Sequence, residues 1–149
     1  MRFIALIVWF VTVLWGLYML AVWLIESDAT RRGSSASRLP LPVILAHVTF
    51  ALTGLGVWVI YLLLDRPALA WADVGVLGVI VTLGTAMFAR WIPVYRSPGA
   101  EVAALAAAQP VPGAPPEGNF PLVVVVAHGL FATSTVVLVL LTALGVGGS

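Results

Sequence analysis

The sequence contains no cysteine and no lysine among its 149 residues, and charged side chains make up only 9% of it. Without cysteine the chain cannot form a disulfide, a thiolate metal site, an iron–sulfur cluster or a cysteine nucleophile. Without lysine it cannot form a Schiff base or use the lysine of a phosphate-binding loop. The net charge of +1 provides no broad basic surface, so no nucleic-acid partner is expected.

The scarcity of charge also excludes a water-soluble domain. Soluble domains have about 25% charged and about 45–50% apolar residues, whereas this chain is 62% hydrophobic with a mean hydropathy of +1.12. Intrinsic disorder requires the opposite composition. Because the few charged residues cannot cover a surface in water, the outer surface must face lipid or other protein. The composition therefore predicts an integral membrane protein.

Four stretches are long and apolar enough to cross a bilayer, which takes about 20 residues of helix. They cover residues 3–25, 41–64, about 71–92 and 120–144, so residues 1–149 form a single transmembrane domain. A cleaved signal peptide is the alternative for the first stretch. Signal cores have only about 7–15 apolar residues, and this stretch is longer and holds three tryptophans, so we interpret it as a retained helix.

The arginines are distributed unevenly between the two sides of these spans. Positive charge favours the cytoplasmic side, which predicts that the first and third loops are cytoplasmic and that both termini lie outside. The arginine, alanine, valine and glycine bias is typical of a bacterial genome, so we expect the bacterial cytoplasmic membrane. The arginines near the first and third loops are Arg31, Arg32, Arg38, Arg90 and Arg96, and those on the opposite side are Arg2 and Arg66.

The third loop, residues 93–119, has a composition of its own. Residues 98–109 favour a short helix near the membrane surface, and residues 110–118 form a proline- and glycine-rich linker. The loop is either a flexible connector or a binding site for a partner.

The chain has two histidines, and both lie inside predicted spans. His47 is in the second span and His128 in the fourth, and each stands in the pattern A-H-x-x-F-A, formed by residues 46–51 and 127–132. Each pattern follows an aliphatic run that begins at a proline, Pro42 or Pro121. This coincidence indicates an internal duplication. We therefore expect an all-α membrane protein, a four-transmembrane-helix bundle built as two repeated helical hairpins.

The duplication predicts that the two histidine-bearing helices run parallel and carry their imidazoles at similar depth. His47 and His128 lie roughly 8–10 Å beyond the two prolines, at 1.5 Å of rise per residue. If these helices are diagonal in the bundle, the side chains point at each other across its axis. An ionisable residue inside a membrane is costly, which favours a functional role for both histidines.

Two facing imidazoles suit haem better than other metal groups. A zinc or di-iron site needs further carboxylate or histidine ligands, and all six acidic residues are expected near span ends or in loops. Haem needs only two axial ligands, which two neutral imidazoles supply. Thioether attachment is excluded because there is no cysteine. We therefore expect one haem b with His47 and His128 as the iron ligands.

The neighbours of the histidines fit the same prediction. Residues three, four and seven positions away on a helix share one face, where small side chains leave room for a flat macrocycle and aromatic ones exclude water. The expected cofactor contacts are Phe50, Ala51 and Gly54 in the second span and Phe131 and Ala132 in the fourth. Haem propionates need cationic partners, for which Arg90, followed by Arg38, is the best-placed candidate.

Other interpretations of these residues stay open. Duplicated histidines can be core residues that donate hydrogen bonds to backbone carbonyls. They can also hold a metal ion, contact a quinone or form a proton path. Arg90, near a helix end, can be an arginine that extends its head group to the membrane surface.

A four-helix membrane bundle with one histidine on each of two helices resembles the small transmembrane b-type cytochromes. It also resembles, more loosely, the haem-bearing membrane anchors of succinate dehydrogenase and one half of haem A synthase. The resemblance rests on His47, His128 and the repeated A-H-x-x-F-A pattern. It implies electron transfer in or beside a respiratory chain. Many such cytochromes bind two haems through four histidines, whereas this chain has ligands for one.

Filled axial positions leave no open site for a substrate, so we expect an electron-transfer protein or subunit rather than a stand-alone enzyme. Its partners would be the lipid bilayer and either a quinone or a redox protein. One haem near one surface cannot carry an electron across about 30 Å of hydrocarbon, which implies a homo-oligomer or a larger membrane complex.

The alternative function is that of a haem-free accessory or assembly subunit of a membrane respiratory complex. A haem-modifying enzyme is a third possibility, but the spans offer no deep acid or nucleophile for it.

Overall fold

The computed structural model describes residues 1–30, 37–96 and 115–146, and within these ranges all regular structure is helical. Four helices are long and apolar enough to cross a membrane: α1 (Arg2–Thr30), α2 (Leu41–Leu64), α3 (Pro67–Tyr95) and α5 (Leu122–Ala143). A short 3₁₀ helix, η1 (Pro116–Asn119), precedes α5. The all-α membrane fold and its four spans are thereby confirmed.

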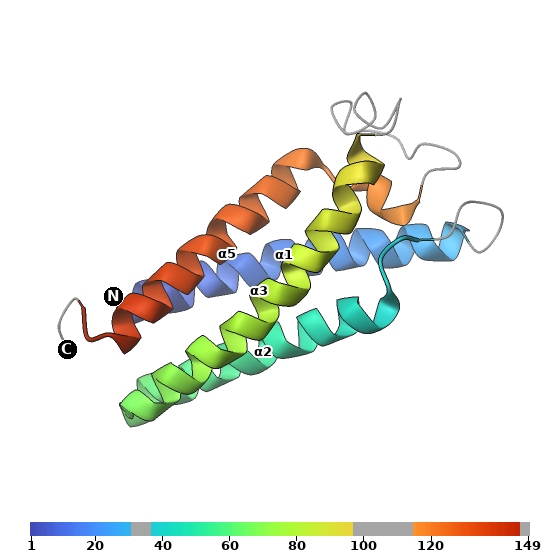
Figure 1. The fold of residues 1–149 in the computed structure, drawn as a ribbon. Helices are drawn as coiled ribbons and strands as arrows, with labels where there is room; N and C mark the ends of the chain where they lie inside the picture. Colours follow the sequence, from blue (N-terminus) through green and yellow to red (C-terminus); the bar gives the residue numbers. More distant parts are fainter. Residues whose placement is uncertain (31–36, 97–114, 147–149) are drawn as a thin grey trace.

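The four long helices form a bundle in which α2 and α5 are diagonal. The packed neighbours are α1 with α2, α2 with α3, α3 with α5, and α5 with α1, and the closest packing is between α2 and α3 and between α1 and α5. The N-terminus and the C-terminal end of α5 lie at the same end as the turn between α2 and α3, which we call the termini end (Figure 1). The opposite end, where η1 lies, is called the loop end. The helices that carry the histidines therefore face each other across the bundle.

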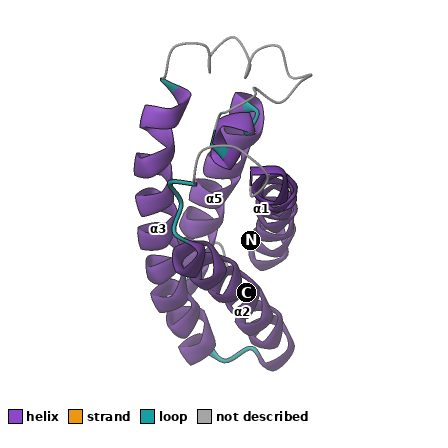
Figure 2. Cartoon of the chain, turned by 90° about the vertical axis from the view of Figure 1, so that its right-hand side faces the viewer, coloured by secondary structure: helices purple, strands orange, loops and turns teal. Residues whose placement is uncertain are grey.

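Prolines and one left-handed residue determine where the helices start and stop. Pro67 opens α3, and Pro40 and Pro121 directly precede α2 and α5. Proline suits the start of a helix because the first amides have no partner inside the helix. Asp65 ends α2 with φ of 50°, and its amide donates to the carbonyl of Tyr61 at 2.8 Å. The resulting tight turn lets α3 pack back along α2 (Figure 2).

The buried apolar residues form two separate clusters, one near each end of the bundle. We call them the termini-end cluster and the loop-end cluster. The residues of α1 and α3 that contact the histidines, and the histidines themselves on α2 and α5, lie along the chain between buried members of these two clusters. The buried members of the termini-end cluster are Ala5, Trp9, Trp58, Tyr61, Ala70, Leu77 and Val139. Those of the loop-end cluster are Trp23, Leu39, Ile44, Trp91 and Phe120.

The segment just before α5 differs from the linker that its composition predicts. Residues 116–119 form η1, which packs against α1 and α3. Glu117 is completely buried, and its carboxylate accepts hydrogen bonds from the hydroxyl of Ser37 at 2.9 Å and the amide of Arg38 at 2.6 Å. Its backbone carbonyl accepts a third bond from the indole of Trp91 at 3.1 Å. These bonds join the first and third connecting segments. The short helix predicted over 98–109 lies outside the described residues.

Candidate functional site

The two histidines lie at the same depth and face each other across the bundle. Each is the seventh residue of its helix, about 9 Å from the loop-end start at 1.5 Å per residue. The ring centroids of His47 and His128 are 6.4 Å apart, with an angle of 60° between the ring planes. Both side chains are half-buried. The duplication therefore brings the two imidazoles together in space.

Each imidazole is held by a backbone carbonyl on a neighbouring helix. The Nδ1 atom of His128 lies 3.0 Å from the carbonyl oxygen of Thr12 on α1. The Nδ1 atom of His47 lies 3.1 Å from that of Ile80 on α3. A carbonyl oxygen can only accept, so Nδ1 must be the donor in both bonds. In the neutral form each ring therefore keeps the lone pair on Nε2 free to act as a ligand or acceptor.

Two glycines let the imidazoles approach these carbonyls. A Cβ atom at Gly16 would lie 3.1 Å from Cε1 of His128, and one at Gly84 would lie 3.1 Å from Cε1 of His47. Each glycine lies one helical turn beyond the residue whose carbonyl accepts the hydrogen bond. Because glycine has no side chain, the imidazole ring can pack directly against the helix backbone at that position. Neither Gly16 nor Gly84 was predicted to contact a histidine, because both are on helices that carry no histidine.

A second repeat in the sequence would have revealed them. Gly16 and Gly84 are separated by the same number of residues as Met19 and Met87 and as Trp23 and Trp91, so the two segments align without a gap. Both segments read G-x-x-M-x-A-x-W, formed by residues 16–23 and 84–91. Both tryptophans are buried in the loop-end cluster, and both methionines pack against it. The duplication thus extends to α1 and α3, and its halves are α1 with α2 and α3 with α5.

Each histidine is anchored by the opposite half of the duplication. His47 belongs to the first half, and its carbonyl partner and glycine are on α3. His128 belongs to the second half, and its partners are on α1. The site is consequently complete only when both halves are packed together.

The other predicted contact residues surround this pair to different degrees. Ala51, Ala132 and Phe131 are half-buried on the two histidine-bearing helices. Phe50 is 39% exposed on the outer surface of the bundle. Gly54 has a different neighbour from the one expected, since a Cβ there would lie 2.7 Å from the indole of Trp9. Gly54 therefore makes room for a tryptophan of the termini-end cluster.

The two predicted arginines lie together at the loop end. The guanidinium of Arg90 donates to the backbone carbonyl of Arg38 at 3.3 Å, and both residues are exposed. Arg90 is six residues beyond Gly84 on α3, about 9 Å along the helix axis. A guanidinium has five N–H donors, so this contact leaves donors for a further acceptor.

Within the described part of the chain, the two imidazoles are the donors that this site brings together. Across residues 1–30, 37–96 and 115–146, no three histidine, cysteine, aspartate or glutamate side chains are grouped closely enough to hold a metal ion. The pair can supply two nitrogen ligands to one metal whose other ligands come with it. No protein-family model matches this chain, and no curated protein or solved structure is found to be similar to it.

Proposed function

We propose that the protein is a membrane b-type cytochrome that binds one haem b between α2 and α5, with His47 and His128 as the axial ligands. The proposal depends above all on the spacing of the two rings. Two imidazoles bound through Nε2 to opposite sides of one metal ion have ring centres about 6 Å apart, from metal–nitrogen bonds of about 2 Å plus the radius of each ring. The observed centroid distance of 6.4 Å fits this geometry. The ring planes can take any angle about that axis, so 60° is compatible with it.

The hydrogen bonds at Nδ1 support the same assignment. Histidines that bind metals commonly donate their second ring N–H to a backbone carbonyl or carboxylate, which fixes the tautomer and the orientation of the ring. Both histidines make this bond, to Thr12 and Ile80. The rings are thus oriented by the protein before any ligand binds.

The surroundings suit an apolar macrocycle. The termini-end and loop-end clusters lie on either side of the histidine layer. Gly16, Gly84, Ala51 and Ala132 present little side-chain volume within it. Arg90 is the candidate partner for the propionates at the loop end, with Arg38 beside it. When bound, haem would supply one-electron redox chemistry, and these residues would orient it and exclude water.

Electron transfer is the function that this coordination favours. With His47 and His128 both bound to the iron, no iron position would remain for oxygen or substrate. The donor and acceptor would be a quinone or a redox partner protein in or beside a respiratory chain. Because the layer lies about 9 Å from the loop-end start of α2 and α5, a second redox group in an oligomer or larger complex is needed to span about 30 Å of hydrocarbon.

A structural role for the histidines is the second candidate function, that of a haem-free accessory or assembly subunit. The Nδ1 hydrogen bonds favour this structural role, because they join α2 to α3 and α5 to α1 whether or not a ligand is present. The two candidates differ in what the Nε2 atoms do.

An absorption spectrum in detergent distinguishes them. We expect protein from haem-replete cells to show a Soret band and, after dithionite reduction, sharp α and β bands. His47→Ala and His128→Ala should each abolish these bands, whereas Thr53→Val, at an exposed position on α2, should keep them. A colourless wild-type protein, or variants that keep normal bands without either histidine, would exclude the proposed cytochrome.

A further inference from the structure

A buried carboxyl group lies between the histidine layer and the termini end. Asp73 on α3 is completely buried, and neither of its carboxylate oxygens has a hydrogen-bond partner. Burying a charged group without a partner is strongly unfavourable. Packing alone therefore gives no reason for an aspartate at this position.

The duplication shows what packing requires there. In the alignment that pairs Gly16 with Gly84, Ala5 of the first half is equivalent to Asp73 of the second. Ala5 and Asp73 are both completely buried. In the first half of the bundle a methyl group is sufficient at this position. The carboxyl of Asp73 is an addition in the second half only, which indicates a role beyond packing.

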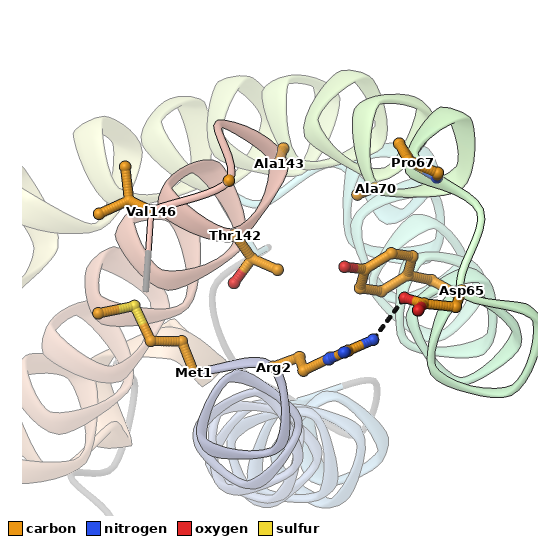
Figure 3. Close-up of a pocket in the computed structure, with 10 residues that line it drawn as sticks. Met1, Arg2, Asp65, Pro67, Ala70, Thr142, Ala143 and Val146 are labelled. Carbon is orange, nitrogen blue, oxygen red and sulfur yellow. Dashed lines mark hydrogen bonds and ion pairs between the residues drawn. The ribbon is translucent and has the colours of Figure 1, made fainter. Parts of the chain in front are cut away.

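A pocket of about 210 Å³ opens at the termini end, and Ala70, three residues before Asp73 on α3, is part of its lining. Arg2 and Asp65 form an ion pair at its rim, and the hydroxyl of Thr142 projects into it (Figure 3). Tyr61 and Ala70 also line it, and both belong to the termini-end cluster. The pocket thus provides a route from the water at this end to the cluster.

Asp73 does not itself line this pocket, but it lies one helical turn from Ala70, which does. It stands three residues after Ala70 and four before Leu77, so it shares the buried face of α3 with both. Side chains on a helix tilt toward the helix N-terminus, and α3 begins at the termini end. The carboxyl of Asp73 therefore points toward Ala70, which forms part of the pocket wall.

A proton is the ligand that suits this site. A metal cation such as Ca²⁺ or Mg²⁺ takes about six oxygen ligands, whereas both carboxylate oxygens of Asp73 are without partners. A proton needs no further ligand, and it removes the buried charge. The other titratable groups at the pocket are the terminal amine of Met1, Arg2, Tyr61 and Asp65, of which Arg2 and Asp65 neutralise each other.

We infer that Asp73 is a proton-binding site that exchanges with water at the termini end through this pocket, and that its protonation is coupled to reduction at the histidine pair. The coupling rests on the proposed function. Asp73 lies seven residues from Ile80 on α3, about 10 Å along the axis from the carbonyl that holds His47. The ferric iron with its porphyrin ring, apart from the propionates, would have one net positive charge, which would stabilise the Asp73 carboxylate. Reduction by one electron from a donor would remove that charge, and Asp73 would then take one proton from the water to become a neutral acid.

Infrared spectroscopy of the haem-free protein tests the proton site alone. We expect a carboxylic-acid C=O band at neutral pH that shifts in D₂O, is absent in Asp73→Ala and is retained in Asp65→Asn. Asp73→Ala installs the residue that the first half of the bundle already uses, so it should fold. Spectra of the wild type and Asp73→Ala that are identical in this region would overturn the site. A band lost upon addition of Na⁺ at constant pH would overturn proton selectivity.

A potentiometric titration tests the coupling. In the haem-loaded wild type, the midpoint potential should fall as pH rises, because reduction takes up a proton. In Asp73→Ala the midpoint should be independent of pH over the same range, and in Thr53→Val, at an exposed position on α2, it should follow the wild type. A pH-independent wild-type midpoint, or an unchanged slope in Asp73→Ala, would overturn the coupling while leaving the cytochrome intact. A colourless protein would instead exclude the cytochrome and with it the coupling, and the infrared result would still decide the proton site.

Discussion

Gly16 and Gly84 hold equivalent places in the two halves of the bundle, and each lies against the Cε1 edge of a histidine imidazole. In both cases the carbonyl one turn earlier on the same helix accepts the Nδ1 hydrogen bond. The missing side chain and the accepting carbonyl therefore act together. One permits the approach of the ring, and the other fixes its orientation.

A large side chain at Gly84 should displace His47. On the proposed function, we expect Gly84→Leu to lower the amount of haem per protein at least several-fold, because a Cβ alone would already lie 3.1 Å from the ring. Gly78→Leu on the same helix is the matched control, since a Cβ there meets nothing within 4 Å and the position is exposed. Haem content is measured from the pyridine haemochrome spectrum. Equal haem in the two variants would contradict the role assigned to Gly84.

Gly54 should be essential for packing rather than for the cofactor. A Cβ at this position would lie 2.7 and 2.9 Å from two atoms of the Trp9 indole. We expect Gly54→Ala to lower the free energy of unfolding by about 1–3 kcal/mol, the usual cost of overpacking a core.

The matched control for Gly54 is two residues further along α2. Gly56 is exposed with nothing within 4 Å of its Cβ position, so Gly56→Ala should stabilise by up to about 1 kcal/mol through helix propensity. Both variants can be compared by reversible unfolding in mixed detergent micelles. A Gly54→Ala variant as stable as Gly56→Ala would show that Trp9 moves aside at no cost.

The carboxylate of Glu117 should stabilise the loop end. It accepts bonds from Ser37 and Arg38, and it is completely buried. Hydrogen bonds to charged groups contribute about 1.5–3 kcal/mol, so we expect Glu117→Ala to lower the free energy of unfolding by at least that amount. Glu117→Gln keeps an acceptor and should cost less, and Ser37→Ala should remove only one of the bonds. The same unfolding assay applies, and an order in which Gln is the more harmful would refute the hydrogen-bond explanation.

The orientation in the membrane can be tested directly because the natural chain has no cysteine. Arg38 and Arg66 are exposed, at the loop end and in the turn at the termini end respectively. With the loop end in the cytoplasm, a membrane-impermeant maleimide added to intact cells should label Arg66→Cys but not Arg38→Cys. Permeabilised cells provide the control, in which both should react. The opposite labelling pattern would reverse the predicted topology.

The sequence was sufficient to predict the fold and the pairing of the histidines, because both follow from periodic features of the chain. Four long apolar runs require four helices, and the repeated A-H-x-x-F-A pattern places His47 and His128 at the same depth. What it did not indicate depends on packing between helices. Gly16 and Gly84 contact imidazole rings that belong to other helices. The sequence around Gly54 likewise does not indicate that Trp9 of another helix packs against it.

The acidic residues show the same limit more clearly. Asp73 and Glu117 were expected near a span end and in a loop, yet both are completely buried. A single acidic residue barely changes the composition of a helix or a linker. The sequence pattern therefore gives no sign that the residue is buried, and it is expected to be exposed to water. Comparison of the two halves, which places Ala5 opposite Asp73, was needed to reveal that this carboxyl is exceptional.

The crossed anchoring of the histidines has a consequence for biogenesis. Either hairpin, inserted alone, would expose an imidazole without its carbonyl and a glycine without its ring. On the proposed function, haem capture would then have to wait until the second hairpin enters the membrane and docks, so a prematurely terminated chain would remain colourless. The absorption bands expected of the mature protein would then report that synthesis and assembly had both been completed.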